Sequence, residues 1–79
     1  MRMTYDPAAD AMYLYLTERT AGDPKVARTK EVAPGLMLDF DRDGRVIGIE
    51  MLSVSQLPGA KPMHMAFEVL ESSDAAAAE

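Results

Sequence analysis

Hydrophobic and polar residues alternate with a period of two along much of the chain. In residues 11–17, AMYLYLT, a methionine and two leucines fall on one side of an extended segment, and two tyrosines fall on the other. This period is typical of a β-strand with one buried face. Shorter strands are predicted over residues 3–5 and 26–32, with turns at Asp6-Pro7 and Pro34-Gly35. The pattern therefore predicts a protein built mainly of strands.

Residues 36–52 alternate in the same way on both sides of an acidic centre, DFDRDGRVIGIE. The acidic spacing matches the loop of an EF-hand calcium site, with Asp39, Asp41, Asp43 and Glu50. An EF-hand needs a helix on each side of this loop, but Pro34-Gly35 leaves too few residues before it. The β-branched residues and glycine that follow also disfavour a helix. The pattern therefore favours a β-hairpin over a metal site.

Burial selects the register of this predicted hairpin. A two-residue Asp43-Gly44 loop is common in hairpins and places the apolar residues of both strands on one face. A three-residue loop would shift the pairing by one and split the apolar set, whereas a four-residue loop keeps the same parity and stays open as an alternative. The two-residue loop pairs Arg42 with Arg45, Phe40 with Ile47, Leu38 with Ile49, and Leu36 with Met51.

The chain after the hairpin carries weaker signals. SVSQLPGAKP contains two prolines and a glycine, which predicts a helical turn at most. Residues 63–71 fit either a strand or a helical stripe, and the connection before them favours a strand. Residues 72–79 are predicted to be a frayed tail. The sequence thus predicts one domain over residues 1–71, mainly β with α+β as the alternative: a single antiparallel β-meander sheet of five or six strands, with at most a short helix after the hairpin or at the C-terminus.

Composition excludes several classes of protein. The 79 residues contain no cysteine, which removes disulfides, thiolate zinc sites and cysteine nucleophiles. A net charge of −5 argues against nucleic-acid binding, which needs clustered basic residues. No signal peptide is recognisable, and the longest apolar run has six residues against the roughly 20 of a membrane span. A cytoplasmic protein that binds neither nucleic acid nor membrane is expected.

Catalytic signatures are sparse. His64 is the single histidine, and the sequence lacks a glycine-rich phosphate loop, a nucleophile elbow and a two-histidine metal motif. We therefore expect a protein that is not an enzyme and holds no cofactor. The alternative is a small enzyme or a ligand- or metal-binding protein with an acidic site at Asp39, Asp41 and Glu50, since paired carboxylates can do acid–base work.

Two stretches, YDPAADAMYLYL and EVAPGLMLDFDRDGRVIGIEML, occur in an order that resembles the prokaryotic domain of unknown function 2283 family. The resemblance covers roughly residues 3–55 and brings no reaction and no catalytic residue. Some relatives are thought to lie beside small toxin-like proteins. The resemblance therefore implies a protein-interaction module, with an antitoxin-like role and a cognate protein partner as the expectation.

A second expectation concerns self-association. A single sheet buries only one face, and a layered domain needs a second element to cover it. No long helix is evident in the sequence to do so, so a homodimer is predicted, with the C-terminal segment folding back as a helix as the rival. The residues expected at interfaces are Tyr13, Tyr15, Leu38, Phe40, Ile47 and Ile49.

Overall fold

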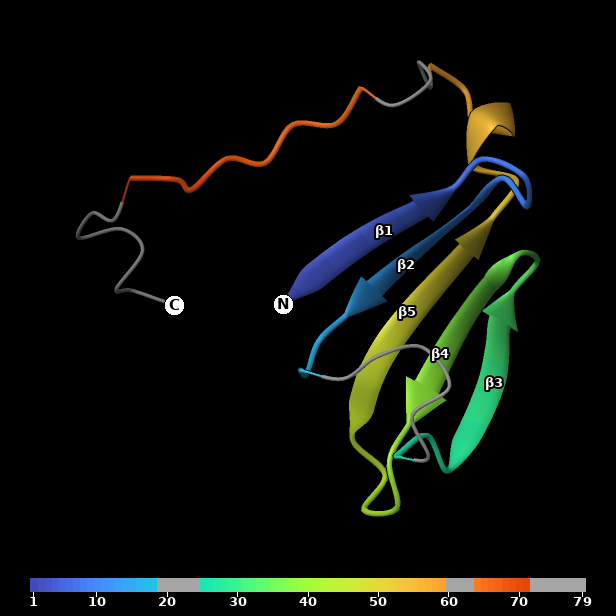
Figure 1. The fold of residues 1–79 in the computed structure, drawn as a ribbon, viewed down its shortest axis with the longest axis vertical. Helices are drawn as coiled ribbons and strands as arrows, with labels where there is room; N and C mark the ends of the chain where they lie inside the picture. The colour runs from blue at the N-terminus through green and yellow to red at the C-terminus, as the bar shows by residue number, and fades with distance from the viewer. Residues whose placement is uncertain (19–24, 60–63, 72–79) are drawn as a thin grey trace.

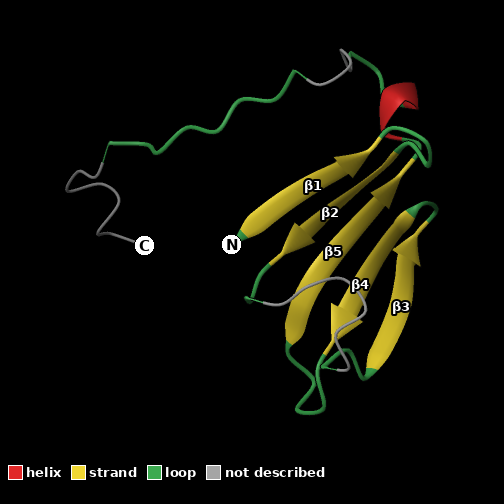
Figure 2. Cartoon of the chain, in the orientation of Figure 1, coloured by secondary structure: helices red, strands yellow, loops and turns green. Residues whose placement is uncertain are grey.

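A computed structural model describes residues 1–18, 25–59 and 64–71, and it contains one open antiparallel sheet (Figures 1 and 2). Its five strands are β1 (Arg2–Asp6), β2 (Ala11–Tyr15), β3 (Arg28–Ala33), β4 (Leu36–Phe40) and β5 (Val46–Leu52). A three-residue 3₁₀ turn, η1 (Val54–Gln56), follows the last strand. The predicted fold, mainly β with a single antiparallel sheet of five strands, is confirmed. The short helix expected after the central hairpin is η1.

The strands are ordered β1-β2-β5-β4-β3, so the last strand in sequence lies at the centre of the sheet. Strands β3, β4 and β5 follow one another as a meander, and β5 then pairs with β2 of the β1–β2 hairpin. The chain leaves β2 beside β5 and enters β3 at the far edge (Figure 1). The Leu16 N–H donates to the Ile47 carbonyl oxygen at 3.0 Å, and the Ala27 N–H donates to Phe40 at 2.8 Å. These bonds anchor the chain where it leaves one hairpin and enters the other.

The turn between β1 and β2 is stabilised by its own side chains. The carboxylate of Asp6 accepts hydrogen bonds from the backbone N–H groups of Ala8 and Ala9, at 3.0 and 3.4 Å. Pro7, which lies between Asp6 and Ala8, has a fixed φ that suits a turn. Asp10 ends the turn with a φ of 50°, a left-handed conformation that aspartate tolerates better than most residues. This is the turn that the Asp6-Pro7 pair predicts.

The turn between β3 and β4 is the predicted Pro34-Gly35 turn. Ala33 lies opposite Leu36, so the loop has two residues, and Gly35 has a φ of 77°. Proline followed by a glycine at positive φ is the combination that a type II turn requires. The register shifts between Glu31 and Ala33, which leaves Val32 as the extra residue of a bulge. Bulges of this kind interrupt the regular hydrogen-bonding edge of an outer strand.

The β4–β5 loop corrects the predicted register near the turn. The Asp41 N–H donates to the Arg45 carbonyl at 2.9 Å, and the Gly44 N–H donates to Asp41 at 3.1 Å. The loop therefore has three residues, with Gly44 at a φ of 83°, as in a type I turn followed by a glycine bulge. Arg45 lies opposite Asp41 rather than Arg42, and Phe40 lies opposite Val46 rather than Ile47. Both of these predicted pairs are wrong.

A second bulge explains why the apolar residues still share a face. Phe40 pairs with Val46, whereas its neighbour Asp39 pairs with Gly48, so Ile47 is an extra residue in β5. The extra residue cancels the one-residue shift that the three-residue loop introduces. Leu38 opposite Ile49 and Leu36 opposite Met51 are consequently as predicted. The expectation that a three-residue loop must split the apolar set is wrong, because it did not allow for a bulge.

The register sorts strand residues into rows across the sheet, since residues opposite each other in antiparallel strands share a face. We call one face the apolar face; its rows are Met3, Leu14, Ile49, Leu38 and Lys30, and Tyr5, Met12, Met51, Leu36 and Ala33. We call the other the tyrosine face; its rows are Arg2, Tyr15, Gly48, Asp39 and Thr29, and Thr4, Tyr13, Glu50, Met37 and Glu31.

Burial is shallow for a folded domain. Among the described residues, the only hydrophobic side chains in the fully buried class are Tyr15 and Ile47, at 6% and 4% exposed. No helix other than η1, and no second sheet, is found in residues 1–18, 25–59 and 64–71. Because η1 has three residues, no described helix is long and apolar enough to cross a membrane. The sheet is thus a single layer within the described residues.

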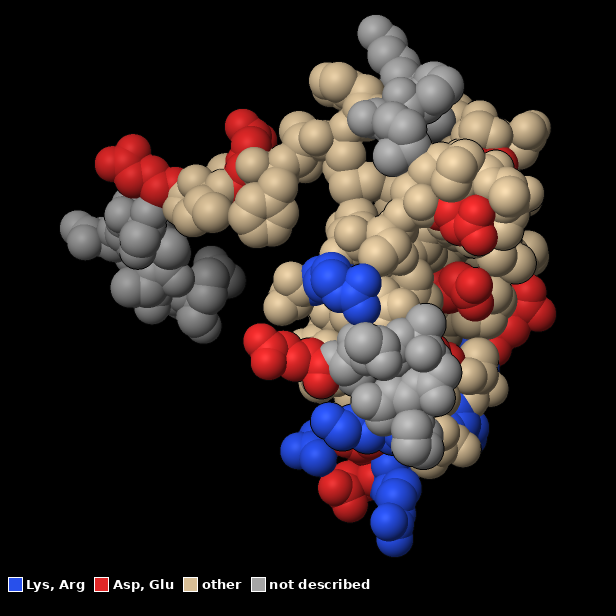
Figure 3. Space-filling model, in the orientation of Figure 1, with Lys and Arg blue, Asp and Glu red and all other residues tan. Residues whose placement is uncertain are grey.

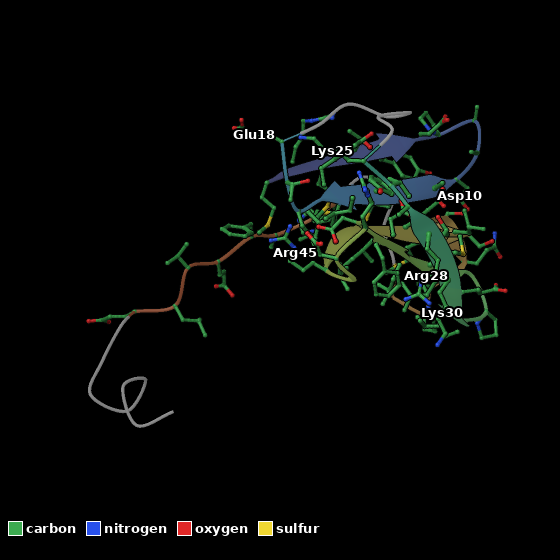
Figure 4. All side chains as sticks on the ribbon, turned by 90° about the horizontal axis from the view of Figure 1, so that it is seen from below. Asp10, Glu18, Lys25, Arg28, Lys30 and Arg45 are labelled. Carbon is green, nitrogen blue, oxygen red and sulfur yellow. The ribbon has the colours of Figure 1, made fainter. Side chains whose placement is uncertain are left out.

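Residues 64–71, which we call the arm, correct the predicted C-terminal strand. They form neither strand nor helix, so the strand expected over residues 63–71 is wrong from His64 onward, and the alternative helix is absent from the same residues. Met63 and the predicted frayed tail, residues 72–79, lie outside the described part of the chain. Figures 1 and 4 both show the arm running away from the sheet.

Candidate functional site

The apolar face carries most of the partly buried aliphatic side chains of the sheet. Its two rows contribute Met12 and Leu14 from β2, Ile49 and Met51 from β5, and Leu36 and Leu38 from β4. All six side chains are only partly buried. The strand rows of this face include no aspartate or glutamate. Its chemistry is therefore suited to apolar packing rather than to binding an ion or a polar substrate.

Positive charge lies along one margin of the apolar face. Arg28 pairs with Phe40 and Lys30 pairs with Leu38, so strand β3 places both basic residues beside the apolar residues of β4. The Arg28 guanidinium lies 4.5 Å from the centre of the Phe40 ring, within range of a cation–π contact. Figure 4 shows Arg28 and Lys30 together on β3, well apart from Lys25. This pair, Arg28 and Lys30, is called the basic margin below.

The tyrosine face has a different construction, built around a gap. Gly48 sits in the middle of a row, between Tyr15 on one side and Asp39 on the other. A glycine in a strand leaves room for large neighbours because it has no side chain of its own. The Tyr13 and Tyr15 rings meet edge to face with their centres 4.5 Å apart. The Arg2 guanidinium lies 3.9 Å from the centre of the Tyr15 ring.

Asp39 links three strands on this face. Its carboxylate accepts a hydrogen bond from the Tyr13 hydroxyl of β2 and another from the Thr29 hydroxyl of β3, the latter at 2.5 Å. Strand β5 lies between β2 and β4, so the tyrosine reaches Asp39 across the strand that carries Gly48. Both carboxylate oxygens of Asp39 thus have a hydroxyl partner. The arrangement is a structural clamp across the sheet.

Asp10 forms the second polar cluster, at the end of the sheet where β1 turns into β2. Its carboxylate accepts hydrogen bonds from the Ser55 hydroxyl at 2.7 Å, the Tyr5 hydroxyl at 2.8 Å and the Ser55 N–H at 3.1 Å. The bonds from Ser55 and then from Tyr5 hold the pKa of Asp10 below its usual range. The same Asp10 bond, with burial and the negative charge nearby, raises the pKa of Tyr5. The cluster ties the first turn to η1.

The carboxylates of the β4–β5 loop bond to other groups of the same loop. Asp41 accepts the backbone N–H groups of Arg45 and Asp43, at 3.0 and 2.9 Å, and the Arg45 side chain at 3.0 Å. These bonds, chiefly the one from the Arg45 N–H, lower the pKa of Asp41. Arg45 also forms an ion pair with Asp43 at 3.2 Å. The carboxylates of the loop therefore fold the turn and neutralise one arginine.

The four acidic residues of the calcium-like spacing do not gather around one point. Asp39 and Glu50 lie in neighbouring rows of the tyrosine face, whereas the bonds of Asp41 and Asp43 lie within the loop. Across residues 1–18, 25–59 and 64–71, no group of three or more histidine, cysteine, aspartate or glutamate side chains is placed to hold a metal ion. The near face in Figure 3 shows the acidic side chains spread over the strands, with basic ones around the β4–β5 turn.

A hollow of about 350 Å³ lies beside this loop. It is open to solvent and is lined by Thr17, Lys25, Ile47 and the charged residues of the loop, Asp41, Arg42, Asp43 and Arg45. The carboxylates that line it already bond to Arg45 or to the backbone. Its two carboxylates, Asp41 and Asp43, are thus engaged within the loop, and Asp39 and Glu50, the other two residues of the acidic spacing, are not among its lining residues.

The predicted interface residues separate into two groups. Leu38, Phe40 and Ile49 are partly buried on the apolar face, and Tyr13 is partly buried on the tyrosine face. Tyr15 and Ile47 are instead buried in the chain itself. The sequence reasoning missed Asp10, whose partners lie five and 45 positions away. The only signal for it was an aspartate ending a turn, which is also common for purely local reasons.

Comparison with known proteins concerns the whole sheet. Residues 2–55 match the family model described as "Protein of unknown function (DUF2283)". The chain belongs to this DUF2283 family. Neither the curated proteins nor the solved structures gave a match. The DUF2283 match includes all five strands, and therefore both faces of the sheet, while the arm lies beyond it.

Proposed function

We propose that this DUF2283 protein is a non-enzymatic interaction module that self-associates, with a second copy of the chain covering the apolar face. The observation that carries the proposal is the uncovered apolar face itself. Six aliphatic side chains from three strands are only partly buried there, and no described helix or second sheet lies over them. Covering such a face is the usual way a single sheet gains a second layer.

A second copy is the occupant that the face fits best. Sheets pack face to face at about 10 Å with their inner side chains interdigitated, which requires two apolar surfaces of similar width. The same chain supplies that matching surface, and a two-fold axis relates the two copies without leaving an open end. The charges of the strands lie mostly on the tyrosine face, so two apolar faces can meet without burying a carboxylate of either strand row.

The alternative function, an acidic site for a ligand, a metal or catalysis, has weaker support. Asp39 already accepts two hydroxyl hydrogen bonds, and Asp41 already accepts two backbone N–H groups. A ligand would have to displace these bonds before it could use either carboxylate. No observation on the described residues favours that exchange, so we propose the interaction role instead.

Light scattering coupled to size-exclusion chromatography tests the proposal. At micromolar concentration the wild-type protein is expected to have twice the 8.6 kDa mass of one chain. Leu38→Lys places a charge in the centre of the apolar face and is expected to reduce the mass to one chain or to unfold the protein. Met37→Lys is the matched control, because Met37 is the preceding residue of β4 and faces the other side, opposite Glu50.

The outcomes separate clearly. Loss of the dimer in Leu38→Lys with the dimer retained in Met37→Lys supports association through the apolar face. Loss in Met37→Lys alone would place the interface on the tyrosine face and contradict the proposal. A folded wild-type protein with the mass of one chain, checked by circular dichroism, would end it. Burying a leucine is worth about 1.5–3 kcal/mol, so a dissociation constant raised at least tenfold is expected from Leu38→Lys.

The antitoxin-like role with a cognate partner stays a prediction that rests on resemblance. The self-association proposal does not depend on it. A partner that binds through the tyrosine face would leave the dimer mass per chain unchanged and would be sensitive to Met37→Lys, so the same control variant distinguishes the two kinds of contact.

A further inference from the structure

The arm exposes several large hydrophobic side chains to solvent. Met65, Phe67, Val69 and Leu70 are 51%, 88%, 84% and 81% exposed. Isolated exposed hydrophobic residues are ordinary, but four large ones within six positions, interrupted by Glu68, form an apolar stretch of the kind that marks a contact site. Figure 4 shows the arm's side chains standing out from it on both sides, and the further part of the arm lies clear of the sheet.

The apolar face is also too small to form a typical interface alone. Five strands about 4.8 Å apart, each about five residues long, make a face of roughly 20 by 17 Å. Each partner in a typical stable interface buries about 800 Å². Two twisted sheets packed face to face also diverge toward opposite corners, which leaves part of each face uncovered. A dimer built on this face therefore needs further apolar surface near a corner or margin.

The distribution of charge indicates at which margin of the apolar face the arm would lie. The arm carries Glu68 and Glu71 among its apolar residues, and the apolar face carries its basic residues, Arg28 and Lys30, along β3. An apolar and acidic segment thus matches an apolar surface with a basic margin. Strand β1, at the opposite edge, places Met3 and Tyr5 on the apolar face and offers the arm no cation there.

We infer that the arm of each copy docks on the apolar face of the other, along the basic margin formed by Arg28 and Lys30. Phe67 and its apolar neighbours cover the β4 side of that face, and the two glutamates lie beside the basic residues. The inference rests on the proposed self-association and names the segment that completes it. The arm points away from its own sheet (Figures 1 and 4), which suits exchange between copies better than a fold-back.

Isotope-filtered NMR on a one-to-one mixture of labelled and unlabelled full-length chains tests the contact directly. The chain has two phenylalanines, Phe40 and Phe67, so the Phe67 ring signals can be assigned by a single substitution. Contacts between the Phe67 ring of one chain and the Leu38 methyl groups of the other are expected. Contacts only within one chain would show a fold-back, and an absence of contacts in a sample of dimeric mass would show a free arm; either result overturns the inference while the self-association proposal stands.

Charge reversal tests the basic margin independently. Lys30→Glu and Glu68→Lys are each expected to weaken the dimer several-fold, and the double variant is expected to recover most of the loss. Glu18→Lys is the matched control for Glu68→Lys, because it makes the same charge change at an exposed residue outside the arm and the apolar face. Phe67→Ser should raise the dissociation constant roughly tenfold to a hundredfold without altering the strand signal in circular dichroism.

The results separate the two proposals. Weakening in the two single variants, recovery in the double variant and no effect of Glu18→Lys support the docked arm. If Phe67→Ser and the charge variants all dimerise like the wild type, the arm plays no part, although the sheet-mediated dimer remains. If the wild type is a monomer, the self-association proposal fails first, and the arm inference fails with it.

Discussion

The two faces of the sheet are made by the same five strands, yet they are completed in different ways. The tyrosine face closes on itself: Tyr15 is 6% exposed, Arg2 lies over its ring, and Asp39 joins hydroxyls from two other strands. The apolar face has no comparable closure among the described residues, and its side chains remain only partly buried. Alternation of side chains thus gives one surface that serves the chain itself and another that is available to a partner.

This difference comes from a single position in the central strand. On the tyrosine face, Gly48 leaves space in the middle of the sheet, and the tyrosine side chains on β2 and the aspartate on β4 approach across it. On the apolar face, the corresponding positions of β5 are Ile49 and Met51, whose large side chains leave no such space. A glycine gives a sheet a local hollow that its own side chains can fill, whereas a continuous aliphatic surface needs another layer.

The largest expected effect concerns how the unfolding free energy of variants on the two faces depends on protein concentration. Tyr15→Ala removes a ring buried within one chain and should cost about 3 kcal/mol of unfolding free energy at any protein concentration. Leu14→Ala, on the adjacent β2 residue of the apolar face, should cost about 2 kcal/mol, and the loss should depend on concentration because the site is completed by association. Thermal unfolding of both variants over a hundredfold range of concentration measures the difference. Equal concentration dependence in the two variants would contradict it.

A smaller effect is expected from the clamp on the tyrosine face. Asp39→Ala leaves the Tyr13 and Thr29 hydroxyls without their shared acceptor and should lower the unfolding free energy by about 1 kcal/mol, since these groups are partly exposed and water replaces part of the loss. Asp39→Asn is the control, because its amide oxygen can still accept one of the two bonds. Urea unfolding measures both variants, and the dimer mass should be unchanged in each. A loss of the dimer in Asp39→Ala would mean that the two faces are coupled.

The sequence predicted the strands because alternation over five or more residues leaves little freedom in which face is buried. It predicted the hairpin in place of the calcium loop for the same reason. It did not predict the bulge at Ile47, because a bulge adds one residue without disturbing the apolar pattern on either side of it. The correct outer pairs, Leu38 with Ile49 and Leu36 with Met51, and the wrong inner pair, Phe40 with Ile47, both follow from this one extra residue.

The contacts that define the two faces depend on strand order, which alternation does not contain. Tyr13 and Asp39 are 26 residues apart and meet only because β5 lies between their strands with Gly48 in the gap. Asp10 and Ser55 are 45 residues apart and meet only because the first turn and η1 share one end of the sheet. The arm was predicted as a strand because Met65, Phe67 and Val69 alternate with other residues. In the structure, residues 64–71 are not paired with any of the five strands.

The smallest expected effect is a dependence on acid that separates the charged contacts from the apolar face. The pKa values of Asp10 and Asp41 are lowered in the folded chain, by hydrogen bonds from Ser55 and Tyr5 and from the Arg45 and Asp43 backbone respectively. The unfolded chain therefore binds protons more tightly at these two residues. Their contribution to stability is complete above the ordinary aspartate pKa of 3.8 and is lost as the pH falls through the lower folded values.

We therefore expect the unfolding free energy to be steady from about pH 6 to about pH 5 and then to fall toward about pH 3, measured by urea unfolding. Asp10→Asn should be less stable than the wild type at the higher pH and should lose less on acidification, because it has no proton to gain. The contact between the two apolar faces themselves, apart from the docked arms, should persist to lower pH than these contacts, since the rows of the apolar face contain no carboxylate. Dissociation that follows the titration of Asp10 and Asp41 would instead show that the ends of the sheet, rather than its apolar face, hold the two copies together.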